Sequence, residues 1–76
     1  MTIDELKDYL SACTSHVLFE HNGRSCGIDP FSQDKFDIWM GEKYMTARSA
    51  EEALNVKFFD GKSIKEIWDD VTELDY

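Results

Sequence analysis

The chain has 76 residues, of which 42% are hydrophobic and 13% aromatic, and its formal net charge is −8. This length suffices for one domain and not for two, so we expect residues 1–76 to form a single small domain. The apolar content argues against disorder, and the negative charge argues against direct binding to nucleic acid or to anionic lipids.

The number of cysteines and the first residues of the chain indicate the cellular compartment in which we expect the protein. The chain has two cysteines, Cys13 and Cys26, whereas a disulfide-stapled secreted miniprotein usually has more. The beginning, Met-Thr-Ile-Asp-Glu-Leu, has early acids and no apolar run, so we expect no signal peptide. No stretch approaches the apolar length of a transmembrane helix. We therefore expect a cytoplasmic protein with free thiols and no membrane association.

The first predicted element is a helix over residues 3–13. Its apolar residues recur at spacings of three and four, which gives one apolar stripe. They are Ile3, Leu6, Leu10 and Cys13. Thr2 followed by Glu5 forms a capping box that satisfies backbone amides at the start of the helix.

Residues 16–29 are predicted to form a β-hairpin around Asn22-Gly23, because both positions of such a turn need positive φ. A two-residue turn there pairs Phe19 with Cys26 and Val17 with Ile28, which gives an apolar core face. The opposite, more polar side is expected to face water. It carries His16, Leu18, Glu20, Ser25 and Gly27.

Residues 29–34 are predicted to be a loop, because Pro30 cannot donate a ladder hydrogen bond. A second hairpin is predicted over residues 35–47, around Gly41-Glu42. Its core face would carry Phe36, Ile38, Met45 and Ala47, and its opposite face Asp37, Trp39, Tyr44 and Thr46.

Two helices are predicted in the remainder, each opened by a capping box. Ser49 with Glu52 begins a short helix, and Ser63 with Glu66 begins a final helix after an aromatic-rich turn at residues 58–61. The final helix would have an apolar stripe of Ile64, Ile67, Trp68, Val71 and Leu74. The fold class predicted is α+β: a four-stranded antiparallel sheet of two hairpins, with the N-terminal, short and C-terminal helices packed on one face.

The main candidate for partner binding is the outer face of the second hairpin. Trp39 and Tyr44 would lie opposite each other there, with Asp37 and Thr46 beside them. Exposed tryptophan and tyrosine are typical of protein-contact hot spots. The alternative is a cross-strand aromatic pair that only stabilises the hairpin.

A metal site is the second candidate. Cys13, His16, His21 and Cys26 have the spacing C-x2-H-x4-H-x4-C. This spacing resembles the retroviral-type zinc knuckle, C-x2-C-x4-H-x4-C, and the resemblance implies that all four residues are zinc ligands. Against it, His16 and His21 would point to opposite faces of a strand, and an acidic chain does not suit the nucleic acid that knuckles bind. We therefore expect two core thiols, two surface histidines and no metal or cofactor.

The third candidate is the acidic side of the final helix, with Asp69, Asp70 and Glu73. These side chains could meet a basic partner or mimic a nucleic-acid backbone, or they could simply be a solvated face.

No catalytic set, phosphate-binding glycine loop or calcium loop is recognisable, so we expect no enzymatic activity. The function predicted is a protein-interaction or accessory module with an unidentified protein partner, as a monomer or weak homodimer. A small zinc-binding module and an acidic nucleic-acid mimic are the alternatives.

Overall fold

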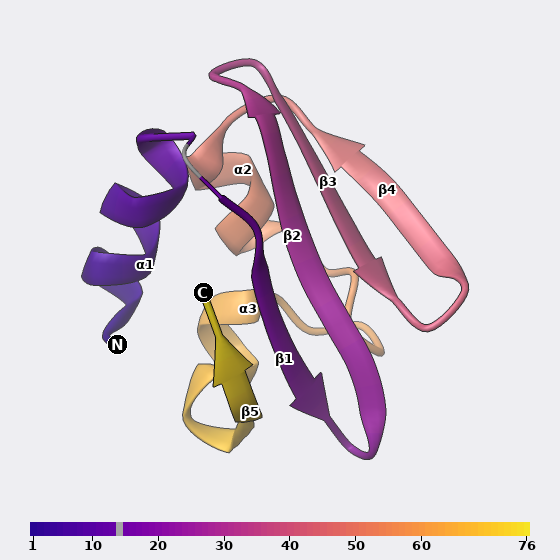
Figure 1. The fold of residues 1–76 in the computed structure, drawn as a ribbon. Coiled ribbons are helices and arrows are strands. Elements are labelled where there is room, and N and C mark those ends of the chain that lie inside the picture. Colours follow the sequence, from indigo (N-terminus) through magenta and orange to yellow (C-terminus); the bar gives the residue numbers. More distant parts are fainter. Residues whose placement is uncertain (14) are drawn as a thin grey trace.

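The computed structural model describes residues 1–13 and 15–76, in which the chain forms an antiparallel sheet of five strands and three α-helices (Figure 1). The strands are β1 (Val17–His21), β2 (Arg24–Ser32), β3 (Lys35–Met40), β4 (Lys43–Ala47) and β5 (Thr72–Asp75). The helices are α1 (Ile3–Ser11), α2 (Ala50–Asn55) and α3 (Ile64–Ile67), the last continued by the 3-10 turn η1 (Trp68–Asp70).

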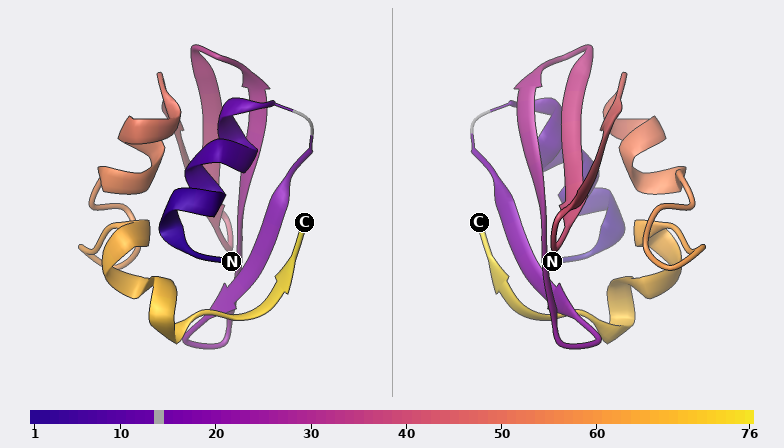
Figure 2. Two further views of the ribbon diagram at one scale, coloured as in Figure 1. Left: turned by 90° about the vertical axis from the view of Figure 1, so that its left-hand side faces the viewer. Right: turned by 90° about the vertical axis from the view of Figure 1, so that its right-hand side faces the viewer.

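The strand order in the sheet is β4-β3-β2-β1-β5, and every neighbouring pair is antiparallel. The three α-helices lie on the same side of the sheet (Figure 2). We call the face toward the helices the inner face and the opposite one, which no described helix covers, the outer face. The α+β class with an antiparallel sheet is confirmed, but the sheet has a fifth strand that was not predicted.

Turn chemistry explains why the two predicted hairpins form in the expected register. Asn22 and Gly23 have φ of 52° and 75°, as a type I′ turn requires, and Val17 pairs with Ile28. In the second hairpin only Gly41, at φ 60°, is left-handed, which suits a glycine-first turn. The pairing follows the prediction there too, with Phe36 opposite Ala47, Ile38 opposite Met45 and Trp39 opposite Tyr44.

The predicted loop at residues 29–34 is wrong, because β2 continues through Ser32 and pairs with β3. Pro30 lies opposite Phe36, and the register shifts between Pro30 and Ser32, which leaves Phe31 as an extra residue. A bulge is one of the few places where a strand tolerates proline. Contrary to the prediction, Pro30 therefore does not end the strand but lies at an irregularity within it.

The predicted final helix is wrong beyond residue 70. The helix gives way to η1, and Val71 is extended, with φ −79° and ψ 149°. Residues 72–75 then pair with β1 as strand β5, so Val71 and Leu74 do not continue a helical stripe. Pairing here satisfies backbone groups along an edge of β1 that a four-stranded sheet would leave open.

The core lies between the inner face and the helices. Phe19 is its aromatic centre, with ring centroids 5.8 Å from those of both Phe59 and Trp68. The Trp68 indole N–H donates to the carbonyl oxygen of Met1 at 2.8 Å, which joins the chain's start to the core. Among the described residues, the largest fully buried side chains are Phe19, Phe36, Phe59, Leu6, Leu10, Ile28, Ile38, Leu54, Ile64, Ile67, Val17 and Cys26.

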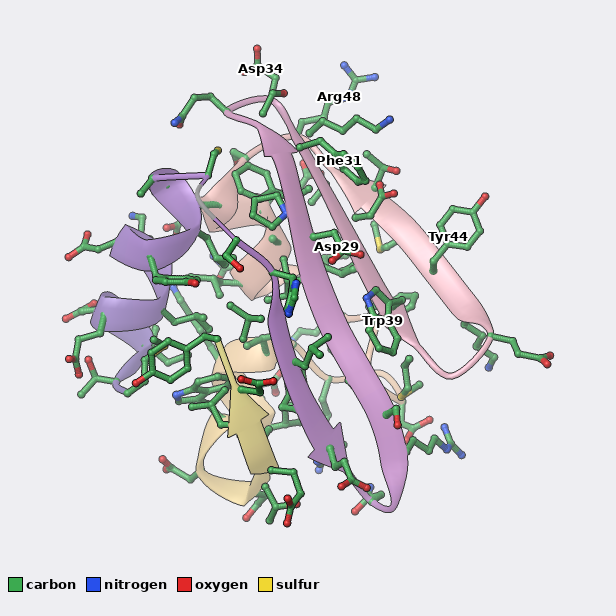
Figure 3. All side chains as sticks on the ribbon, viewed as in Figure 1. Asp29, Phe31, Asp34, Trp39, Tyr44 and Arg48 are labelled. Carbon is green, nitrogen blue, oxygen red and sulfur yellow. The ribbon has the colours of Figure 1, made fainter. Side chains whose placement is uncertain are left out.

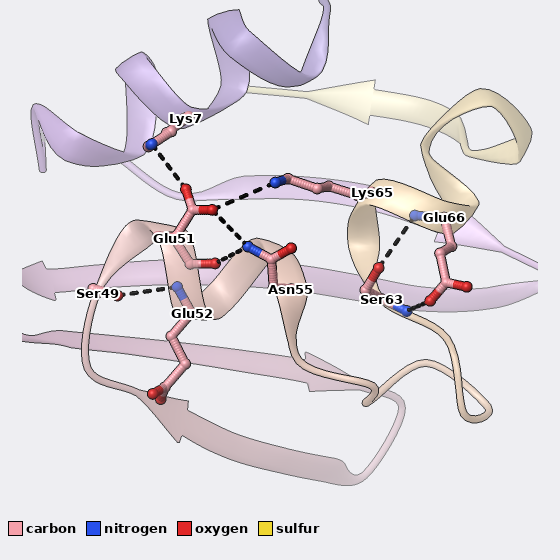
Figure 4. A network of polar contacts seen from close by, with 8 residues as sticks. All are labelled: Lys7, Ser49, Glu51, Glu52, Asn55, Ser63, Lys65 and Glu66. Carbon is pink, nitrogen blue, oxygen red and sulfur yellow. Dashed lines mark hydrogen bonds and ion pairs between the residues drawn. The ribbon is translucent and has the colours of Figure 1, made fainter.

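Side-chain caps stabilise the ends of the helices, and ion pairs join the helices to one another. Thr2 with Glu5 and Ser63 with Glu66 form complete capping boxes. Ser49 caps α2 through the backbone N–H of Glu52, whereas the Glu52 carboxylate accepts from the N–H of Arg48 instead. Glu51 joins the three helices, because its carboxylate meets Lys7 of α1 at 2.8 Å and Lys65 of α3 at 3.5 Å (Figure 4).

Candidate functional site

Aromatic and small residues form a continuous line across the outer face. Tyr44 is paired with Trp39, Trp39 with Gly27, Gly27 with Leu18, and Leu18 with Asp75. Trp39 and Tyr44 project from neighbouring strands on this uncovered side (Figure 3). We call Tyr44, Trp39, Gly27 and Leu18 the aromatic row, since its two rings provide most of its apolar surface.

The two aromatic side chains differ in how much water reaches them. The Trp39 indole is half-buried, because it lies over Gly27: a Cβ built on that glycine would be 2.5 Å from Trp39 Cε2. Tyr44 has no such support and is 71% exposed. The sheet therefore holds Trp39 in place, while Tyr44 extends into solvent.

Asp37 and Thr46 lie beside the aromatic row and are held to each other. The Thr46 hydroxyl donates to Asp37 Oδ1 at 2.7 Å, and the two residues are direct cross-strand partners. On its other side Asp37 is paired with Asp29, so two carboxylate-bearing residues face each other across β2 and β3. Like charges in directly opposed positions destabilise a sheet. This part of the face would be stabilised by an added positive charge.

A hollow of about 360 Å³ lies between the aromatic row and the C-terminal strand. It is lined by Leu18, Phe19, Glu20, Ser25, Cys26, Trp39, Glu73 and Asp75. Trp39 forms one wall of this space, and β5 supplies the far wall. Three acidic residues, Glu20, Glu73 and Asp75, therefore line the hollow together with Trp39.

The sequence does not predict this hollow, because the final helix that it predicts extends through Leu74. Glu20 and Leu18 were assigned to the outer face, but nothing in the sequence brought Glu73 and Asp75 to them. One signal was available: a four-stranded sheet leaves β1 as an open edge, and open edges are usually paired or blocked.

Ion pairs within the described residues all lie away from the outer-face carboxylates. They join Lys7 and Lys65 to Glu51, Arg24 to Asp60 at 3.0 Å, and Lys57 to Glu66. Lys35, at the start of β3, has its ammonium 5.1 Å from the ring centroid of Phe31. In the part of the chain that the structure describes, Glu20, Asp29, Asp37, Glu73 and Asp75 form no ion pair.

The structure does not bring the four residues of the knuckle-like spacing together. His16 is exposed before β1, Cys13 is half-buried after α1, and Cys26 is buried on the inner face. Burial raises the pKa of the Cys26 thiol, which donates to the carbonyl oxygen of Arg24 at 3.5 Å. Among residues 1–13 and 15–76, no three His, Cys, Asp or Glu side chains are grouped as metal ligands.

His21 is not the surface histidine that was predicted, since it is only 7% exposed. It follows Phe19 by two positions, so the strand period turns both side chains to the inner face. Its Nε2 lies 3.3 Å from the Asn22 side-chain nitrogen, while Nδ1 has no partner among the described atoms. The strand period predicts that His16 and His21 point to opposite faces, but it does not by itself predict that His21 is buried.

The predicted acidic helix face does not exist as such. Asp69 and Asp70 are exposed on η1, whereas Glu73 belongs to β5 and lines the hollow. The three carboxylates therefore do not share one helical surface, and only Glu73 belongs to the outer face.

Within the described residues, no helix has the length and apolar character needed to cross a membrane. No protein-family model, curated protein or solved structure matches the chain.

Proposed function

We propose that this chain is a non-catalytic protein-interaction module that docks a partner protein on its outer sheet face. Trp39 and Tyr44 are the anchors, and Asp37 and Thr46 are the polar contacts beside them. The observation that carries the proposal is the exposure of Tyr44, at 71%, next to a half-buried indole on a face that no described helix covers.

The two aromatic residues suit different parts of such an interface. Trp39 is already held against Gly27, so a partner that covers it immobilises little that was free before. Tyr44 offers a large amphipathic side chain that loses few rotatable bonds on binding. Tryptophan and tyrosine are enriched among residues that contribute most to binding energy.

The alternative is that the pair only stabilises the hairpin. This explains the position of Trp39 better than that of Tyr44. The contact with Gly27 gives Trp39 a structural role within the sheet. Tyr44 leaves most of its surface in water, so its contribution to hairpin stability is small. A partner contact accounts for an aromatic residue at this exposed position.

The proposal includes the setting in which the module works. We place it in the cytoplasm, since its thiols are free and Cys26 is buried within the core. The partner is a protein, not a nucleic acid or a membrane, because the outer face is lined with carboxylates. Self-association would be weak at most, as the two edge strands, β4 and β5, are both short.

Site-specific photo-crosslinking tests the proposal. Tyr44 is replaced by a photoreactive phenylalanine analogue, and in a matched protein Lys62, which is exposed on the helical side, is replaced instead. After irradiation in lysate of the source organism, we expect one discrete adduct from position 44 and none from position 62. Trp39→Ala should abolish that adduct while circular dichroism shows an intact fold. Equal adducts from both positions, or an adduct that survives Trp39→Ala, would refute docking on this face.

A further inference from the structure

We propose that the hollow beside Trp39 receives an arginine side chain from a basic segment of the partner protein. This inference rests on the proposed function, because it names the chemistry of the partner that the outer face binds. It depends on the shape of the hollow, on the charges that line it and on the cost of covering those charges.

The shape comes from residues on four strands. Trp39 on β3 forms one wall, residues of β1 and β2 line the space between, and β5 forms the opposite wall. The resulting volume, about 360 Å³, is within the range of sites that enclose a small molecule or a side chain. An extended side chain can therefore enter the hollow without any movement of the sheet.

The charges are of one sign. Glu20, Glu73 and Asp75 line the hollow, and none of them forms an ion pair with a described residue. Asp29 and Asp37 continue the negative charge along the outer face beyond Trp39. The hollow therefore attracts a cation and repels phosphate groups.

The cost of desolvation excludes a purely apolar occupant. An apolar surface pressed onto Trp39 and Leu18 would also cover the carboxylates beside them. Burying an unpaired carboxylate is far more costly than the gain from covering one half-buried indole. The partner must supply positive charge at the position where it contacts the ring.

Arginine fits this combination better than lysine. A guanidinium group stacks on an indole face and at the same time donates two parallel hydrogen bonds to a carboxylate. The ammonium of lysine is more strongly hydrated and cannot make the bidentate contact. The hollow places an indole and acidic residues around one space, so a guanidinium bound there can make both of these contacts at once.

The experiment uses nuclear magnetic resonance of the intact chain with two peptides, hexa-arginine and its neutral isostere hexacitrulline. The two tryptophans report separately, because the Trp68 indole N–H is bound to the Met1 carbonyl on the helical side while Trp39 lines the hollow. We expect hexa-arginine to shift the Trp39 indole signal and the Gly27 amide, and to leave Trp68 unchanged. Hexacitrulline should bind at least about tenfold more weakly, since it lacks the charge.

Two charge-matched double variants separate the hollow from net charge. Glu73→Gln with Asp75→Asn removes two charges that line the hollow, and Asp69→Asn with Asp70→Asn removes two on η1 outside it. We expect the first pair to weaken hexa-arginine binding about three- to tenfold, as loss of two partly exposed ion pairs would. The second pair should weaken it by less than about twofold, because those charges act only at long range.

Several outcomes would overturn the inference. Equal weakening by both double variants would mean that only net charge matters, and equal binding of hexacitrulline would mean that charge is irrelevant. Shifts at Trp68 without shifts at Trp39 would place the peptide on the other face. If hexa-arginine fails to bind while the photoreactive analogue at position 44 still forms its adduct, this inference is wrong and the proposed docking face stands. If that adduct is also absent, both proposals are wrong.

Discussion

The indole of Trp39 occupies the space that a side chain at Gly27 would need. A Cβ at position 27 would lie 2.5 Å from Trp39 Cε2, 2.5 Å from Cζ2 and 2.7 Å from Nε1. The two residues are direct cross-strand partners, so the contact follows from the register of β2 and β3. Glycine is required here for close approach of the ring, not for an unusual backbone angle.

Gly27→Ala is therefore expected to displace the indole into solvent. The free energy of unfolding should fall by about 1–2 kcal/mol, the usual cost of forcing extra atoms into a packed contact. Trp39 fluorescence should move to longer wavelength at the same time. In a Trp39→Ala background the same substitution should be neutral or slightly stabilising, because alanine is favoured over glycine in a strand. Equal losses in both backgrounds, measured by urea unfolding, would show that the ring is not the obstacle.

Two neighbouring residues on β3 allow a direct test of which face is inside. Ile38 is fully buried on the inner face and Trp39 is half-buried on the outer one. Ile38→Ala should lower the free energy of unfolding by about 2–5 kcal/mol, the range for deletions in a core. Trp39→Ala should cost about 1 kcal/mol, as for a cross-strand aromatic contact. Urea unfolding in which Trp39→Ala proved the more damaging change would place the indole in the core.

The two central hairpins could be predicted from the sequence because local chemistry specifies them. Asn22-Gly23 and Gly41-Glu42 fix the turns, and the alternation of apolar residues then fixes the register. The same reasoning placed Trp39 opposite Tyr44 on the outer face. That this face binds a partner remains a prediction, because the register of the paired strands does not identify what binds to them.

The C-terminal strand and the hollow could not be predicted because they depend on tertiary contacts. Val71 and Leu74 fit a helical stripe that begins at Ile64, and the spacing contains nothing that stops the helix at residue 70. What decides the structure is the open edge of β1, which lies far away in the chain. The hollow needs both this pairing and the indole of Trp39 on β3, so no single segment contains it.

Glu73 adopts a left-handed backbone conformation, with φ 54°, at an irregularity in the pairing of β5 with β1. Such a conformation costs a non-glycine residue about 1–2 kcal/mol, and β-branched residues suffer most. Glu73→Val should therefore be less stable than Glu73→Gly by about that amount in urea unfolding. Glu73→Gln, which changes only the charge, should stay close to the original chain. Equal stability of the valine and glycine variants would mean that the tail is not held in this conformation.

The Glu51 carboxylate is expected to make stability depend on pH in the acid range. The hydrogen bond from Lys7, helped by Asn55 and by the charge of Lys65, lowers its pKa from 4.5 to about 2 (Figure 4). A carboxylate whose pKa is lower in the folded chain contributes stability above its unfolded value. That contribution is lost as the pH falls from about 4.5 toward 2.

Glu51→Gln removes this titration, so the free energy of unfolding should depend less steeply on pH between about 5 and 2. Glu42→Gln is the matched control, because Glu42 is exposed in the β3–β4 turn and forms no ion pair with a described residue. Added salt should reduce the difference between the two variants, since the pairs of Glu51 with Lys7 and Lys65 are solvent-accessible. Urea unfolding at a series of pH values tests this expectation. Parallel pH profiles for Glu51→Gln and the original chain would show that these contacts among the three helices are not maintained in solution.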